Sequence, residues 1–272
     1  MFSDILKAIL LGIIQGFTEW LPISSTGHLL LFDSLWPLLP PAFFEVFKVV
    51  IQFGSILAVI MLYWDRLNPF AEKLTVRKRR QIVHLWVQIL IGAIPAGIAG
   101  LLLDGLIEQY LSANFVIAVT LIAYGIIFIL ISLHPKKPTI RSLSQLSWKQ
   151  SLGIGCFQCL ALIPGTSRSG ATIIGGLEMG CSRAVASEFS FFVAIPVMAG
   201  ASVLKIVKFW INTGWFTGTQ LLLLLLGTVT AFVVSVYAVR ALLSYVRTHT
   251  FEIFGWYRIV LGILVLCVFY LF

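Results

Sequence analysis

The stretch QGFTEWLPISSTGH, from Gln15 to His28, places a carboxylate, several hydroxyls and an imidazole inside an otherwise apolar N-terminal region. Polar groups are costly to bury in an apolar environment unless they find partners. We therefore expect this cluster to have a function. The proline and glycine within the stretch also interrupt an apolar run that would otherwise be long enough to cross a membrane.

The composition identifies the class of protein. The chain has 272 residues, of which 59% are hydrophobic and only 11% are charged, whereas a soluble domain has about 25% charged residues. Runs of about 20 apolar residues, the length of a transmembrane helix, begin near Phe43, Ile82, Phe115, Glu188, Gln220 and Phe251. The sequence predicts an all-α polytopic membrane protein with six spans.

Two further apolar segments, Ile5 to Leu31 and Ser151 to Gly180, are broken by Pro, Gly, Ser and Thr. Their centres resemble each other: QGFTEWLPISSTG and QCLALIPGTSRSG both begin with Gln, carry a Pro in the middle and end in Ser-x-Ser/Thr-Gly. Each final glycine is followed 18 residues later by a glutamate that heads a span, Glu45 and Glu188. The pattern predicts an internal duplication.

Each half then contains one broken segment and three spans, and an odd number of spans inverts the second half. We expect one membrane domain, with repeat 1 at about 1–134, a cytoplasmic linker at about 135–149 and repeat 2 at about 150–272. Inverted repeats bring discontinuous helices together near the membrane midplane. The broken segments are therefore predicted to be re-entrant helix hairpins whose tips meet.

The second tip, PGTSRSGAT from Pro164 to Thr172, combines a turn, several hydroxyls and Arg168. A guanidinium and the N–H groups at a helix start are suited to phosphate. An arginine at membrane depth requires a partner, which is either a bound anion or a protein carboxylate. The surrounding hydroxyls and glycines favour the anion.

Three residues of the first tip are candidates for chemistry. Glu19 either pairs with Arg168 or caps a helix, or acts as a base, and these roles are compatible. His28 is either a packed, hydrogen-bonded histidine or an acid, a base or an alternative nucleophile. Ser25 is a candidate nucleophile, because Glu19 or His28 could take its proton while Arg168 neutralises charge. Attack by water activated by Glu19 is the alternative.

At these residues the chain resembles the undecaprenyl-pyrophosphate phosphatase family, the bacitracin-resistance type of integral membrane phosphatase. The matching stretches are the two tips together with FEVFKVVIQFGSILAV and ASEFSFFVAIPVMAG. The resemblance implies hydrolysis of undecaprenyl pyrophosphate to the monophosphate, which recycles the lipid carrier of peptidoglycan synthesis and confers bacitracin resistance.

Site residues follow from the same resemblance. The expected catalytic residues are Glu19, Ser25, His28 and Arg168. The expected substrate-binding residues are Gln15, Ser24, Thr26, Gly165, Thr166, Ser167, Ser169, Gly170 and Thr172. A divalent cation, Mg²⁺, is implied, with Glu19 as its contact. Many members have Glu where this chain has Gln15, which weakens any scheme with two carboxylates on a metal.

The net charge of +8 has a membrane explanation. Basic residues cluster at 66–80, 136–149 and 240–247, in loops that fall on one face of a six-span protein, and the positive-inside rule makes this face cytoplasmic. We expect a multi-pass protein of the bacterial inner membrane with its C-terminus outside, and no nucleic-acid partner. The resemblance further implies an active site on the outer face and a homodimer. The alternative function is a transporter or flippase for a polyprenyl phosphate lipid, because inverted repeats with broken helices are transporter architecture.

Overall fold

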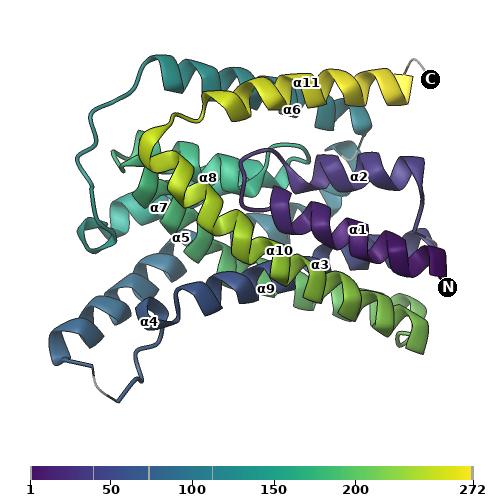
Figure 1. Ribbon diagram of the computed structural model, residues 1–272, viewed down its shortest axis with the longest axis horizontal. Helices are drawn as coiled ribbons and strands as arrows, with labels where there is room; N and C mark the ends of the chain where they lie inside the picture. The colour runs from purple at the N-terminus through teal and green to yellow at the C-terminus, as the bar shows by residue number, and fades with distance from the viewer. Residues whose placement is uncertain (1, 39, 73, 112, 271–272) are drawn as a thin grey trace.

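The computed structural model describes residues 2–38, 40–72, 74–111 and 113–270, and this part of the chain is built from helices (Figure 1). The α-helices are α1 (Phe2–Thr18), α2 (Ser25–Leu35), α3 (Pro41–Leu62), α4 (Trp64–Leu67), α5 (Val76–Leu111), α6 (Asn114–Leu133), α7 (Trp148–Cys159), α8 (Arg168–Glu178), α9 (Arg183–Thr213), α10 (Gly218–Thr248) and α11 (Glu252–Tyr270). Two short 3₁₀ turns are η1 (Leu143–Gln145) and η2 (Leu160–Leu162).

Six of these helices, α3, α5, α6, α9, α10 and α11, are long and apolar enough to cross a membrane. The predicted all-α polytopic class and its six spans are confirmed. Expected and observed starts differ most for α5, which begins at Val76 rather than near Ile82 because the basic residues before the apolar run also adopt helical structure.

The two broken segments form helix hairpins, α1 with α2 and α7 with α8. The helices α2, α7 and α8 have 11, 12 and 11 residues, and at 1.5 Å per residue they are shorter than the hydrocarbon core of about 30 Å. Figure 1 shows the hairpins entering from opposite ends of the molecule, with their connecting loops facing each other in the middle. This arrangement fits the re-entrant hairpins expected from the sequence.

Exposed tryptophans mark the two ends of the helical bundle. At the end that contains α4 and the starts of α5 and α7, three tryptophans are more than half exposed: Trp64, Trp148 and Trp256. At the end that contains both termini, the exposed tryptophans are Trp36, Trp210 and Trp215. Tryptophan is enriched at both membrane interfaces. The helical axes in Figure 1 therefore run between two interfaces, and the loops rich in Lys and Arg share one of them.

Contacts between helices recur in the two halves of the predicted repeat. Helix α1 packs against α10 and α7 packs against α5, while α6 packs against α11 and α3 against α9. In the predicted repeat, α1 corresponds to α7 and α5 corresponds to α10. The contact of α1 with α10 is therefore the counterpart of the contact of α7 with α5, as a duplication predicts. The inverted relation between the halves and the repeat boundaries stay predictions.

Glycines allow the closest of these approaches. In the α6–α11 pair, a Cβ placed on Gly125 would lie 2.7 Å from the carbonyl oxygen of Gly255, and a Cβ on Gly255 would lie 2.7 Å from that of Gly125. In the α3–α10 pair, a Cβ on Gly54 would lie 2.1 Å from the carbonyl oxygen of Thr228. Small residues at helix contacts are typical of membrane proteins, where close backbone approach replaces the hydrophobic effect as the driving force.

The α6–α11 contact gives a test of the fold. We expect Gly125→Ala to lower the midpoint of thermal unfolding in detergent, because the new methyl group must push α11 away, at a cost of about 1–3 kcal/mol. The matched control is Gly105→Ala in α5, where a Cβ meets no atom of another described residue within 4 Å. Equal midpoints for the two variants, measured by intrinsic fluorescence, would contradict the close contact.

Candidate active site

The two hairpin tips have the same backbone conformation at the residue that begins their second helix. Ser24 precedes α2 with φ 70° and Ser167 precedes α8 with φ 71°. These are the only non-glycine residues with positive φ in the described part of the chain. Each serine side chain accepts a hydrogen bond from the N–H three residues later, at Gly27 and Gly170. Such strain persists where surrounding contacts enforce it, commonly at functional sites.

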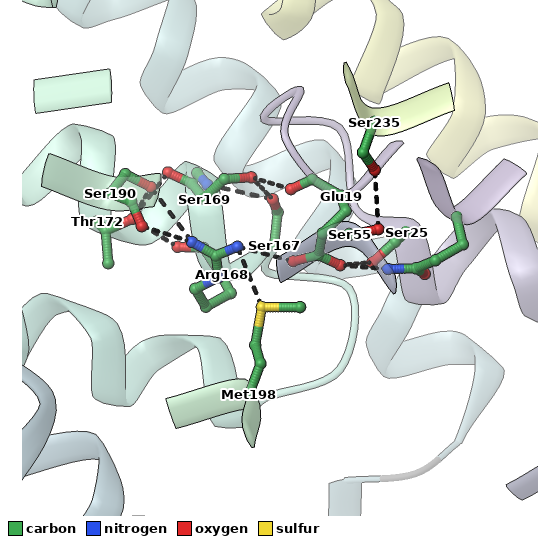
Figure 2. A network of polar contacts seen from close by, with 12 residues as sticks. Glu19, Ser25, Ser55, Ser167, Arg168, Ser169, Thr172, Ser190, Met198 and Ser235 are labelled. Atoms are coloured by element: carbon green, nitrogen blue, oxygen red, sulfur yellow. Dashed lines mark hydrogen bonds and ion pairs between the residues drawn. The ribbon is translucent and has the colours of Figure 1, made fainter. Parts of the chain in front are cut away.

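The tips meet through Glu19 and Arg168, as Figure 2 shows. Nη2 of Arg168 donates to Oε1 of Glu19 at 2.8 Å, although 149 residues separate them. The hydroxyl of Ser25 donates to the other carboxylate oxygen, Oε2, at 2.9 Å, and Nε2 of Gln15 donates to the same atom at 2.9 Å. One carboxylate thus holds a guanidinium on one side and a serine hydroxyl on the other.

Both members of this ion pair are buried, with side-chain exposures of 12% for Arg168 and 5% for Glu19. Several groups fix the guanidinium: Nη1 donates to the carbonyl oxygen of Ser190 at 2.8 Å, Nη2 lies 3.4 Å from the sulfur of Met198, and the group stacks over the Trp20 ring at 5.4 Å. Breaking a buried pair by removing one partner leaves an uncompensated charge and costs about 3–5 kcal/mol.

A pocket of about 190 Å³ lies beside this pair and is lined by both tips. Seven residues expected from the sequence line it: Glu19, Ser24, Ser25, Thr26, Gly165, Ser167 and Arg168. The middles of three spanning helices close it, through Gln52 of α3, Ala96 of α5 and Val197 of α9. Ala96 and Val197 directly follow Pro95 and Pro196, which interrupt the hydrogen bonding of α5 and α9.

Three of the predicted diphosphate ligands have other partners. The Ser169 hydroxyl lies within 3.2 Å of the carbonyl oxygens of Glu19 and Leu21, and the Thr172 hydroxyl donates to the carbonyl oxygen of Arg168. The N–H of Gly170 donates to the hydroxyl of Ser167, which caps α8. The bonds of Ser169 join the two tips, whereas those of Thr172 and Gly170 stay within the second hairpin. All three residues are outside the lining of the pocket. Gln15 and Thr166 are also outside that lining.

His28 also lies outside the pocket lining. Its Nδ1 is 2.7 Å from the carbonyl oxygen of Ser24, its Nε2 is 2.7 Å from the hydroxyl of Tyr257, and the two rings are stacked. Although His28 is only three residues after Ser25, its imidazole points toward α11 and is hydrogen-bonded on both nitrogens. The structure therefore brings Glu19, Ser25 and Arg168 together and places His28 apart from them.

Sequence reasoning missed Arg258 of α11, whose side chain is fully buried. Its guanidinium donates to the carbonyl oxygens of Pro22 in the first tip at 3.1 Å and of Gly165 and Thr166 in the second tip at 3.0 Å each. No ion pair among the described residues includes it, so backbone carbonyls satisfy this charge. The available signal was an arginine within an apolar span, which is costly unless it has partners.

The polar groups around the pocket are incompletely satisfied. Both amide atoms of Gln158 and Oε1 of Gln15 are buried and make no hydrogen bond to any described residue, and Nε of Arg168 is likewise unpaired. Gln158, which lines the pocket, is the counterpart of Gln15 in the second tip. An unsatisfied buried polar group costs about 1–3 kcal/mol. Water or a polar ligand in the pocket can complete the hydrogen bonds of Gln158, which lines it.

Glu19 and Arg168 are the only charged side chains among the described residues that line the pocket. Their charges cancel, so the pocket is close to neutral. The described residues contain no cluster of three or more His, Cys, Asp or Glu side chains that could form a protein-only metal cage.

Comparison with known proteins identifies the family. The family model described as bacitracin resistance protein BacA matches residues 8–264. The chain belongs to this family. It is 51% identical over 270 residues to the undecaprenyl-diphosphatase of Desulfitobacterium hafniense, covering 98% of this chain and 96% of that protein. It is also 49% identical over 269 residues to undecaprenyl-diphosphatase 1 of Clostridioides difficile, with 98% and 97% covered.

A third relative is the undecaprenyl-diphosphatase of Enterococcus faecalis, which is 49% identical over 275 residues. The match covers 98% of this chain and 98% of that protein. Both hairpin tips lie within residues 8–264 of the family match, as do the six spanning helices apart from the last residues of α11. The resemblance stated from the two tip motifs is confirmed.

The position of Arg258 gives a test of the site's architecture. We expect Arg258→Met to lower the thermal unfolding midpoint strongly, because it leaves three tip carbonyls without their donor, each at about 1–3 kcal/mol. Arg240→Met in α10 is the matched control, since Arg240 is exposed. An unchanged midpoint in Arg258→Met would show that the tips hold together without this residue.

Proposed function

We propose that this protein is an undecaprenyl-diphosphate phosphatase that releases inorganic phosphate and undecaprenyl phosphate. The observation that carries the proposal is the contact of Ser25 and Arg168 with opposite oxygens of Glu19 in one buried pocket. This arrangement provides a hydroxyl, a base for its proton and a cation for the developing charge. The names of relatives about 50% identical over nearly the whole chain support the same activity.

In the proposed reaction, Oγ of Ser25 attacks the terminal phosphorus of the diphosphate and gives its proton to Oε2 of Glu19. The bond between that phosphorus and the bridging oxygen breaks, and undecaprenyl phosphate leaves with the electron pair. Water then displaces the serine oxygen from phosphorus, with Glu19 taking a proton from the water and returning one to Ser25. Direct attack by water, with Glu19 as base, uses the same groups without a phosphoserine.

Arg168 supplies the positive charge that phosphoryl transfer requires, because positioning and charge stabilisation account for most of its catalysis. Its unpaired Nε is a free donor for a phosphoryl oxygen. We assign Ser24, Thr26, Ser167 and the backbone of Gly165 to the diphosphate, since they line the pocket. Ser169, Gly170 and Thr172 then support Arg168 from behind. His28 is assigned to holding the first tip against Tyr257.

The size of the pocket agrees with binding of a headgroup alone. Its volume of about 190 Å³ is below the range of about 300–1,000 Å³ that encloses a drug-sized ligand. A diphosphate with a cation needs little space, and the long isoprenoid tail stays in the surrounding membrane. The tail then contributes affinity through its hydrophobicity while the chemistry stays in the polar pocket.

A divalent cation fits the charge balance of this site. A diphosphate brings several negative charges into a pocket whose own charges cancel, so an additional cation is needed. Mg²⁺ is held in many phosphate enzymes by one or two carboxylates together with substrate oxygens. Glu19 and the unpaired amide oxygen of Gln158, which both line the pocket, would provide such ligands. When bound, the cation would neutralise charge on the diphosphate.

The proposed setting is the bacterial inner membrane, with the basic end in the cytoplasm, the C-terminus outside and the site reached from the outer face. Both termini lie at the end opposite the basic loops (Figure 1), which supports this orientation. In this setting the enzyme recycles the lipid carrier of peptidoglycan synthesis and acts as a homodimer. Nucleic acid is not a partner in this proposal.

The test is phosphate release from undecaprenyl diphosphate by the purified protein in detergent. We expect Ser25→Ala and Arg168→Ala each to lower kcat by about 10²–10⁴-fold, because one loses the attacking group or its positioning and the other loses charge stabilisation. The control is Ser34→Ala, an exposed serine in the same helix as Ser25. Because the two residues act as one unit, the double variant should be little worse than either single variant.

The outcome that overturns this proposal is no phosphate release from well-folded wild-type protein, with and without Mg²⁺. Transport of a polyprenyl phosphate lipid would then be the function to test, since it needs the anion site but no nucleophile.

A second test concerns the cation. We expect chelation with EDTA to lower phosphate release by at least about 100-fold, since metal ions contribute several kcal/mol to such reactions. Adding Mg²⁺ in excess should restore the rate. Activity that survives thorough chelation would show that Arg168 alone neutralises the diphosphate.

A further inference from the structure

A second cavity, of about 700 Å³, lies at the basic end of the molecule, away from the pocket beside Glu19. It is formed where the chain leaves α6, where α8 turns into α9 and where α10 turns into α11. These turns gather on the left of Figure 1. Nothing in the proposed phosphatase reaction uses this cavity.

Four cationic side chains from three separate segments line the cavity: Lys136, Lys137, Arg183 and Arg247. The single acidic residue in the lining is Glu178, which pairs with Lys136. The lining therefore carries three uncompensated positive charges. Lys137 and Arg247 form no hydrogen bond or ion pair with the described residues, and Arg183 uses Nη1 for the carbonyl oxygen of His249 at 2.7 Å.

The start of α9 adds to this positive field. Ser182, Arg183 and Ala184 line the cavity at the N-terminus of a helix of 31 residues. The first N–H groups of a helix have no partner within it, and they favour anions. The Ser182 hydroxyl satisfies only the N–H of Val185. Charged side chains and a helix terminus thus converge on one space.

The lining of this cavity also includes apolar side chains. Ile131, Leu177, Val246 and Phe251 contribute to its lining. Two neighbours of lining residues point outward, Leu133 with 60% of its surface exposed and Ile253 with 56%. Trp256, one turn into α11, is exposed at the level expected for the interface. A ligand in this cavity can therefore have both a polar anionic part and a hydrocarbon part.

We propose that this cavity binds an anionic glycerophospholipid of the leaflet at the basic end. Its phosphate lies among Lys137, Arg183 and Arg247, and its acyl chains lie along the outer surfaces of α6 and α11. Basic pockets between membrane helices are known sites for acidic headgroups. A soluble phosphate would satisfy the charges but would leave the apolar lining and the exposed Leu133, Ile253 and Trp256 beside it uncovered, which is why we assign a lipid.

The test is lipid retention by the detergent-purified protein in native mass spectrometry, with phosphatidylglycerol compared with phosphatidylcholine as probes. The variant is Lys137→Ala/Arg247→Ala. The control, Arg77→Ala/Lys149→Ala, removes two exposed cations from the same end but outside this cavity. We expect the variant to bind phosphatidylglycerol about 30-fold more weakly, which is about 2 kcal/mol at 1.4 kcal/mol per tenfold and corresponds to about 1 kcal/mol per basic residue.

In support, wild type and control would retain phosphatidylglycerol in preference to phosphatidylcholine, while the cavity variant would not. Equal loss in variant and control would overturn the proposal, because it would indicate general attraction to a basic surface. Displacement of the lipid by millimolar glycerol 3-phosphate would also overturn it in favour of a soluble anion. Wild type, cavity variant and control should release phosphate at equal rates in lipid-free detergent. Equal rates verify that all three are folded, independently of lipid binding.

Discussion

The ion pair between Glu19 and Arg168 is the contact on which the rest of the site depends. It joins two loops that are 149 residues apart in the chain, at a distance of 2.8 Å. Each partner would be prohibitively costly in this environment without the other. The same contact aims the second carboxylate oxygen at Ser25 and holds the guanidinium beside the pocket. The orientation of the Glu19 carboxylate that stabilises the contact between the tips is therefore also the orientation that the proposed reaction uses.

Around this contact the protein uses backbone carbonyls as extensively as side chains. Arg258 binds carbonyl oxygens of both tips, and Arg168 binds that of Ser190. Backbone carbonyl oxygens of a non-helical tip inside a membrane protein need donors from the surrounding protein or from water in a cavity. A long helix carrying a buried arginine, α11, meets this requirement for both tips simultaneously. The loops are thus stabilised by the spans that surround them.

Much of this arrangement could be predicted from the sequence, because its signals are local. Apolar run length gave the six spans, and the matched motifs at Gln15 and Gln158 located the hairpins. The cost of an unpartnered arginine at membrane depth predicted that Arg168 has a partner, but the hydroxyls and glycines around it favoured a bound anion over a carboxylate, and the structure shows Glu19 in that place. Side-chain direction could not be predicted. Nothing in the spacing distinguishes Ser167, which lines the pocket, from Ser169, whose hydroxyl bonds to the first tip. His28 and Arg258 depend on contacts with α11 and the tips that only the packed structure reveals.

The similar backbone at Ser24 and Ser167, with nearly equal positive φ, has a further consequence, because the residue after each serine begins the second helix of its hairpin. In the first tip that position holds Ser25, and in the second it holds Arg168. A symmetric ancestor with identical tips could offer two hydroxyls or two guanidiniums, but not one of each. The proposed reaction uses a hydroxyl and a guanidinium at this position, so it calls for two tips that differ. Because both tips belong to one polypeptide, each has its own residue there, and one fold of the backbone can present two different groups to the same pocket.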